Sequence, residues 1–142
     1  MAIFNPYLNF NGNTEEAFNF YKSVFGGEFT GFQRLKDTPN ADKIPKEALN
    51  MIMHIALPIG NGNTLMGTDA PELMGFHIIE GNNFYISINT ESKEESDEIY
   101  NKLSVGARNI EMPLGDAFWG AYYACFTDKF GIQWMINFEY KR

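Results

Sequence analysis

Few side chains in this sequence have the chemistry of a catalytic or metal-binding group, and His54 is the first of them. It lies in an alternating stretch, residues 51–59, on the face opposite Met51, Met53, Ile55 and Leu57. A lone histidine in a strand is more often a hydrogen-bonded structural residue than a ligand, so that is our first interpretation. Contact with a bound ligand, acid–base catalysis and metal ligation are the alternatives. His77 lies in a linker, residues 70–82, where we expect it to be exposed.

The remaining reactive groups are one thiol and scattered carboxylates. Cys125 is the single cysteine, so an intrachain disulfide is impossible, and its position in an aromatic strand predicts a buried core thiol. Glu111 and Asp116 could lie at the rim of a site, although solvated loop charges are the simpler interpretation. The sequence has no GxGxxG between a strand and a helix, no GxSxG, no Walker A and no CxxC.

Composition limits the class of protein that could hold these residues. The chain has 142 residues, which indicates one domain or two small repeated halves. Its net charge of −7 is spread along the sequence, which argues against binding to a nucleic-acid backbone. It has no long apolar run and no basic leader, so we expect no membrane span, no signal peptide and a cytoplasmic location.

The order of elements that would position these residues is strand–helix–strand–strand–strand, repeated once. In the first half we expect a helix capped by Asn13, with Glu16 at the capping-box position, and in the second half a helix capped by Ser92, with Glu95 in that role. The first helix should bury a stripe at i, i+3, i+4 and i+7 spacing: Ala17, Phe20, Tyr21 and Val24. We expect strands at residues 3–10, 28–35, 51–59 and 64–69, and then at 84–89, 107–112, 116–127 and 131–138.

The last strand shows most clearly that the sheets have two different faces. Ile132, Trp134, Ile136 and Phe138 alternate with Gln133, Met135 and Asn137. The first set predicts a hydrocarbon core, whereas the second is polar without charge, which suits an open cleft better than bulk solvent. One helix can cover only one face of its sheet, so the other faces must meet each other, a partner chain or a ligand.

Several segments of this pattern resemble the vicinal-oxygen-chelate superfamily of glyoxalases, bleomycin- and fosfomycin-resistance proteins and extradiol dioxygenases, and most closely its PhnB-like group. The matching segments are residues 6–12 (PYLNFNG), 16–17, 20–21, 53–54, 65–66, 112–114 (MPL), 118–120 (FWG) and 128–137 (DKFGIQWMIN). The resemblance implies an α+β fold of two βαβββ modules, about 1–70 and 83–142, within a single domain 1–142. Its curved mixed sheet would form a cup with the helices on the outer face, commonly completed by a homodimer.

Metal-dependent members of that superfamily take ligands from the first strand of each module and from the last strand. Here those positions fall at or beside Tyr7, near Asn83 and at Met135, none of which is a good ligand for Zn, Mn or Fe. We therefore expect no cofactor of that kind, with a displaced divalent metal site as the alternative. Some PhnB-like sequences carry a methyltransferase label, but the absent GxGxxG argues against a methyl-donor loop of that type.

The functional prediction is binding of a small molecule, planar or aromatic, in an aromatic and polar cup. The expected ligand-binding residues are Tyr7, Asn9, His54, Tyr85, Ser87, Trp119, Gln133 and Met135. Trp119 could equally fill the core or a dimer seam, and of Tyr122 and Tyr123 one should face the core and the other the cup. The alternatives are a lyase, isomerase or dioxygenase-like enzyme that uses His54 or a displaced metal, and an interaction module without a ligand.

Overall fold

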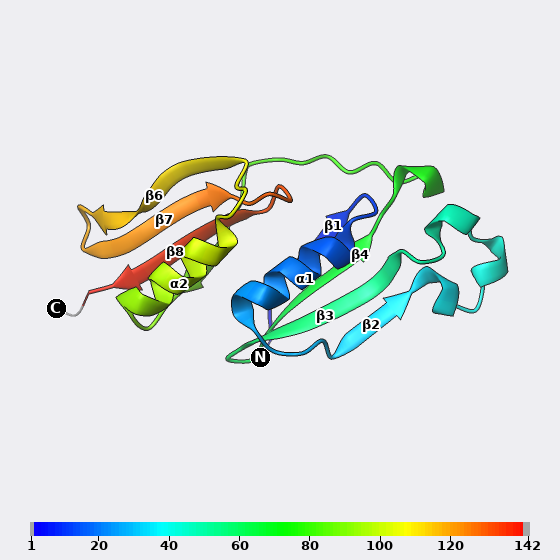
Figure 1. The fold of residues 1–142 in the computed structure, drawn as a ribbon, viewed down its shortest axis with the longest axis horizontal. Coiled ribbons are helices and arrows are strands. Elements are labelled where there is room, and N and C mark those ends of the chain that lie inside the picture. The colour runs from blue at the N-terminus through cyan, green and yellow to red at the C-terminus, as the bar shows by residue number, and fades with distance from the viewer. Residues whose placement is uncertain (1, 141–142) are drawn as a thin grey trace. The chain divides into compact units, whose positions relative to one another are not determined.

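The computed structural model describes residues 2–140, and the chain divides between Ile79 and Glu80 into two compact units (Figure 1). The first comprises β1 (Tyr7–Phe10), α1 (Thr14–Phe25), β2 (Gly31–Arg34), β3 (Ile52–Gly60) and β4 (Asn63–Asp69). The second comprises β5 (Ile86–Asn89), α2 (Lys93–Leu103), β6 (Asn109–Ala117), β7 (Ala121–Thr127) and β8 (Gln133–Glu139). The prediction of an α+β fold built from two βαβββ modules is therefore confirmed.

The two sheets share one topology. Their strand orders are β1-β4-β3-β2 and β5-β8-β7-β6. In each sheet the first pair is parallel and the other two pairs are antiparallel. A parallel pair needs a crossover, and α1 and α2 supply it between the first strand and the rest of each module.

The core of the first module lies between α1 and one face of its sheet. Phe18 and Tyr21 of the helix are fully buried, as are Ile55 and Leu57 of β3. Gly67 of β4 leaves room for Phe18, because a Cβ at Gly67 would lie 2.6 Å from the Cε1 atom of Phe18. The helix stripe therefore differs from the predicted one: Phe18 is buried, whereas Phe20 is only partly so.

The core of the second module lies between α2 and the face of its sheet that carries Trp134 and Ile136. The ring of Tyr100 in α2 meets that of Phe126 in β7 edge-on, at 5.6 Å between centroids. The side chain of Asp128, fully buried, accepts hydrogen bonds from the backbone N–H groups of Phe130 and Ile132 and from Nε1 of Trp134. The carboxylate thereby fixes the predicted turn between β7 and β8.

The two helices begin differently. Ser92 caps α2 as predicted, since its hydroxyl accepts a hydrogen bond from the Glu95 N–H. Asn13 occupies the cap position of α1, but within residues 2–140 its side chain makes no capping hydrogen bond. Asp69, at the end of β4, accepts from both the N–H and the hydroxyl of Thr14 instead, at 3.0 and 2.6 Å. A buried carboxylate from a distant strand therefore takes the place of a local cap.

Two local features depart from the expected strand pattern, and one loop forms as expected. A register shift opposite Gln33 and Arg34 places Ile52 in the core and leaves Met53 exposed, so Ile52 and His54 do not share a face. The segment after β2 forms short 3₁₀ turns at Leu35–Asp37, Ala41–Lys43 and Lys46–Ala48, as expected for an exposed loop with helical character; a fourth lies at Glu72–Met74. Finally, β6 continues to Ala117, so Phe118 and Trp119 lie in the turn before β7.

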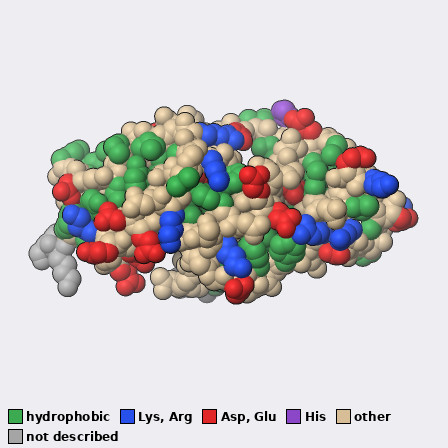
Figure 2. Space-filling model, viewed as in Figure 1, with side chains coloured by type: hydrophobic (Ala, Val, Ile, Leu, Met, Phe, Trp, Pro, Cys, Tyr) green, Lys and Arg blue, Asp and Glu red, His purple; other side chains and the backbone are tan. Residues whose placement is uncertain are grey.

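The surface shown in Figure 2 carries acidic and basic side chains close together, without a large basic patch in that view. Neither helix in residues 2–140 is long and apolar enough to cross a membrane.

Candidate functional site

Each sheet has a face that points away from its own helix, which we call the helix-distal face. In the first module Gly67 contacts Phe18 of α1, and its register partners Leu8 and Ile55 are buried on the same side. Side chains alternate along a strand, so their neighbours point the other way. The helix-distal face of the first sheet is therefore formed by Tyr7, Asn9, Gln33, His54, Met66 and Thr68.

The centre of this first face is a contact between Tyr7 and His54. The hydroxyl oxygen of Tyr7 lies 3.1 Å from Nδ1 of His54, and the two ring centroids are 5.8 Å apart. The imidazole also lies against Gly31 of β2, since a Cβ there would be 3.3 Å from Cδ2 of His54. Three strands thus position one histidine whose side chain is half-buried. The structural, ligand-contacting and acid–base interpretations of His54 are all compatible with this arrangement.

The other polar residues of the first face are uncharged. Asn9 is exposed beside its register partner Thr68. The Thr68 hydroxyl donates to the carbonyl of Met53 at 2.7 Å, which braces the bulged part of β3. His77, in contrast, is exposed in the segment between the modules, as expected.

The helix-distal face of the second sheet carries sulfur and aromatic side chains. Phe126 faces α2, so its neighbour Cys125 points away from the helix. In register with Cys125 lie Met112 of β6 on one side and Met135 of β8 on the other, and Met135 is in turn paired with Ser87 of β5. Cys125 is 9% exposed. It is a buried thiol, as predicted, but it lies on the helix-distal face and not in the core between α2 and the sheet.

Two tyrosines lie close to this thiol. Burial, together with hydrogen bonding to Cys125, raises the pKa of Tyr123 to about 12. The pKa of Tyr85 is raised by burial and then by the charges of Glu111 and Cys125. Glu111, an exposed residue of β6, accepts a hydrogen bond from the Thr127 hydroxyl at 2.9 Å. Tyr85 and Tyr123 therefore lie near Cys125, and Glu111 lies near Tyr85.

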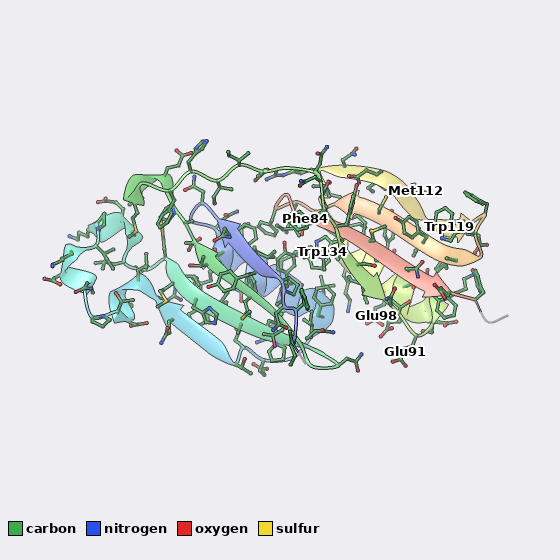
Figure 3. The ribbon with its side chains drawn as sticks, turned by 180° about the vertical axis from the view of Figure 1, so that it is seen from behind. Phe84, Glu91, Glu98, Met112, Trp119 and Trp134 are labelled. Atoms are coloured by element: carbon green, nitrogen blue, oxygen red, sulfur yellow. The ribbon has the colours of Figure 1, made fainter. Side chains whose placement is uncertain are left out.

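The adjacent aromatic residues decide between Tyr122 and Tyr123 and exclude one of the alternatives for Trp119. Tyr122 faces α2, where its hydroxyl donates to Asp97 at 2.5 Å, so Tyr123 is the helix-distal tyrosine. Trp119, labelled in Figure 3, is 48% exposed. Its ring meets that of Tyr123 edge-on at 5.2 Å between centroids. Trp119 therefore does not fill the core of its module, and it extends the aromatic surface around Tyr123.

Gln133 is buried and does not face an open cup, and two carboxylates lie in a strand, as the expected strands 107–112 and 116–127 imply. The Gln133 side chain is buried and its Nε2 donates to the backbone carbonyl of Phe84, which anchors the segment before β5. Glu111 and Asp116 both belong to the edge strand β6 and not to a loop, and Asp116 accepts a hydrogen bond from the Tyr140 hydroxyl. Residues missing from the expected site are Met112, Tyr123 and Cys125, which only the register of three strands brings together.

The sequence as a whole was compared with protein families and solved structures. Residues 3–136 match the model of the Glyoxalase/Bleomycin resistance protein/Dioxygenase superfamily. The chain belongs to this superfamily. Protein PA1353 from Pseudomonas aeruginosa has a structure that is similar to it, with a TM-score of 0.82, 36% identity and 98% of each chain covered.

Two further relatives are similar over nearly their whole length. A Bacillus cereus structure, described as a putative 3-demethylubiquinone-9 3-methyltransferase, PhnB protein, has a TM-score of 0.75 and 25% identity, covering 96% of this chain and 99% of that one. Protein YjdN of Escherichia coli (strain K12) is 25% identical over 144 residues, or 94% of this chain and 92% of the relative. The predicted resemblance to the superfamily, including PhnB-like proteins, is confirmed.

The superfamily's divalent metal can be tested against the residues present. Tyr7 contacts His54, Asn83 is exposed before β5, and Met135 lies beside Cys125. Across residues 2–140, no three His, Cys, Asp or Glu side chains form a group that could hold a metal ion. Zn, Mn and Fe(II) require such nitrogen, oxygen or thiolate donors to converge. The donor set therefore does not fit the chelate chemistry of the metal-dependent members.

Proposed function

We propose that the protein binds a planar or aromatic small molecule on the helix-distal faces of its sheets, without the divalent metal of its metal-dependent relatives. The observation that carries the proposal is the contrast between its two tryptophans. Trp134, on the helix-facing side, is 1% exposed and hydrogen-bonded, whereas Trp119 is 48% exposed beside Tyr123. Exposed aromatic surface costs free energy in water, so Trp119 is better explained by a ligand than by packing within its module.

The second module supports the aromatic part of this proposal. Trp119 and Tyr123 meet edge-on, and Tyr85 is near enough to Tyr123 to contribute to its raised pKa. Ser87, exposed beside Met135, adds a hydroxyl that could orient a ligand. Small-molecule sites typically combine aromatic walls with a few polar groups in this way.

The first module supports the polar part. Tyr7, Asn9 and His54 present hydroxyl, amide and imidazole groups without a fixed formal charge. Such groups hydrogen-bond a neutral heteroatom without the desolvation cost of an ion. We keep all eight expected residues, from Tyr7 to Met135, as proposed ligand contacts; Gln133 would have to act through an amide that is already anchored to Phe84.

A second candidate function is an enzyme of the lyase, isomerase or dioxygenase-like kind, in which His54 acts as acid or base. The hydrogen bond between Tyr7 and His54 favours it, because a hydroxyl on Nδ1 would fix the imidazole tautomer and leave Nε2 for a substrate. A displaced divalent metal would belong to this alternative. Among residues 2–140 no group of three or more metal-binding side chains converges, which counts against the displaced metal but not against His54 as an acid or base.

We also propose that the chain is one domain and forms a homodimer in the cytoplasm. Large apolar side chains are exposed before β1 and between the modules: Ile3, Phe4, Phe76, Ile79 and Phe84. A second copy of the chain would cover such surface. Light scattering gives the oligomeric state directly.

The ligand proposal is tested by tryptophan fluorescence of protein stripped with a chelator. Planar aromatic compounds are titrated, and we expect at least one to change the emission in a saturable way. Trp119→Phe should remove most of the change, because buried Trp134 is then the only indole left. An equal change in the Trp119→Phe variant, or none with any compound, would count against the proposal.

A further inference from the structure

Three sulfur-containing residues are placed side by side on the second sheet by the register of its strands. Cys125 in β7 pairs with Met112 in β6 and with Met135 in β8. Neighbouring strands lie about 4.8 Å apart, so the two methionine Cα atoms flank that of Cys125 at that spacing. Partners in register point the same way, so the row belongs to one face, with Met112 paired to Cys125 between two register shifts of β6.

The lengths of these three side chains would allow their sulfur atoms to bind one ion. The short side chain stands in the middle, and the two long ones stand on either side. Methionine has three rotatable bonds and adapts to irregular surroundings, so both thioethers can lean over the thiol. Met112, labelled in Figure 3, is 41% exposed and lies at a register irregularity of β6. A metal ion could therefore enter from the Met112 side.

The donor chemistry selects the kind of ion. One thiolate and two thioethers are soft ligands, which favour Cu(I) over the harder ions Zn²⁺, Mn²⁺ and Fe²⁺. A monovalent ion bound by one thiolate forms a neutral unit, whereas a divalent ion would leave a net positive charge. Neutrality is important here, because Cys125 is 9% exposed and unpaired charges are costly to bury.

We propose that Met112, Cys125 and Met135 form a binding site for one monovalent soft metal ion, Cu(I) by preference. On binding, the Cys125 S–H loses its proton to solvent, a metal–sulfur bond forms, and the two thioethers complete the coordination without a change in oxidation state. Tyr123 lies two residues from Cys125 on the same face of β7, so its hydroxyl would be available to donate to the bound thiolate. This site uses none of the positions of the superfamily's divalent metal except Met135, and it does not rest on the binding of an organic ligand.

Competition under anaerobic conditions tests the site. The protein is titrated with Cu(I) held by bicinchoninate, and native mass spectrometry with Ag(I), a redox-inert probe, gives the stoichiometry. The deciding variant is the double change Met112→Leu/Met135→Leu, because leucine conserves the volume of methionine and leaves the thiol in place. The matched control is Met53→Leu/Met66→Leu, which removes two thioethers from the first module.

We expect one Cu(I) per chain, a loss of affinity of at least about tenfold in Met112→Leu/Met135→Leu, and no change in the control. Cys125→Ser should abolish binding, with circular dichroism showing that it remains folded. Wild-type affinity in the Met112→Leu/Met135→Leu protein would show that a lone thiol binds the ion, and this would overturn the proposal. Failure of the wild-type protein to compete with bicinchoninate would overturn it as well.

Discussion

The Tyr7 hydroxyl oxygen lies 3.1 Å from Nδ1 of His54, although 47 residues separate the two in sequence and β4 runs between their strands. Both side chains lie on the helix-distal face, where the register partner of Tyr7 in β4 is Met66. The contact shows that this face is organised by side chains from different strands and is more than a set of independent solvated residues.

The tautomer of His54 should depend on Tyr7. If the phenol donates to Nδ1, the neutral imidazole carries its proton on Nε2. Nitrogen-15 NMR of the ring should therefore show mainly the Nε2–H form in the wild-type protein and a shift towards a mixture in Tyr7→Phe. Exposed His77 serves as the internal control. His54 signals that do not change in Tyr7→Phe would contradict this account of the contact.

Gly67→Ala should destabilise the first module. The new Cβ would lie 2.6 Å from Phe18 Cε1 and 3.1 Å from the Leu8 carbonyl oxygen, so the ring or the helix must move. Overpacking of this kind costs about 1–3 kcal/mol, to be measured by urea denaturation. Gly115→Ala is the matched control, since its Cβ would meet nothing closer than the Pro113 oxygen at 4.0 Å. Equal stabilities for the two variants would show that the packing of Phe18 does not depend on the missing side chain at Gly67.

Asp69→Ala should be among the most destabilising single changes in the chain. The carboxylate is buried and accepts from the N–H and hydroxyl of Thr14 and from the N–H of Ile52. Removing it leaves buried donors without their acceptor, with a cost of about 3 kcal/mol. Asp42→Ala, at an exposed aspartate, should change the free energy of unfolding by less than about 0.5 kcal/mol. A similarly small effect at Asp69 would mean that water or another group replaces it.

Stability should fall at alkaline pH through Tyr122. Its hydrogen bond to Asp97 raises the pKa of the phenol from 10.0 to about 12. The unfolded chain then loses this proton near pH 10 while the folded chain keeps it, so the contribution is complete below about pH 10 and is lost between pH 10 and 12. Tyr122→Phe should flatten the decline of the free energy of unfolding over that interval.

Spectrophotometric titration of the phenolate gives an independent check. In Asp97→Asn, one tyrosine that ionises at high pH in the wild type should ionise at lower pH. The neutral amide no longer opposes ionisation of Tyr122. Glu94→Gln, at an exposed position in the same helix, is the control. If both variants titrate like the wild type, Asp97 is not the cause of the raised pKa.

Much of the fold was predictable because its signals are local. The alternation along β8 and the Asp128–Gly131 turn depend on neighbouring residues, and both are found as expected. The burial of Phe18 was not predictable, because it depends on the gap at Gly67 that β4 supplies from 49 residues away. The bulge at Met53 likewise leaves no sequence signal, since isoleucine and methionine fit either face of a strand.

The candidate site was predictable only in part for the same reason. The alternation of side chains along single strands predicted that Tyr7, His54 and Met135 lie on helix-distal faces. It could not show that Tyr7 reaches His54, that Met112 and Met135 flank Cys125, or that Trp119 lies in a turn against Tyr123. These relationships are set by register between strands, which a single sequence does not specify when both faces carry apolar residues.

The most direct test of the central claim is whether binding of a small molecule needs a divalent metal. Protein dialysed against a chelator is screened by thermal shift with planar aromatic compounds, and each stabilising compound is titrated again with Mn²⁺, Zn²⁺, Ni²⁺ or Fe²⁺ present. A ligand at 100 times its Kd stabilises the folded state by about 2.7 kcal/mol, so a true ligand gives a clear, saturable shift. We predict the same shift with and without these ions. Stoichiometric divalent metal retained through purification, or stabilisation only after metal is added, would contradict the claim and favour the enzyme that uses His54.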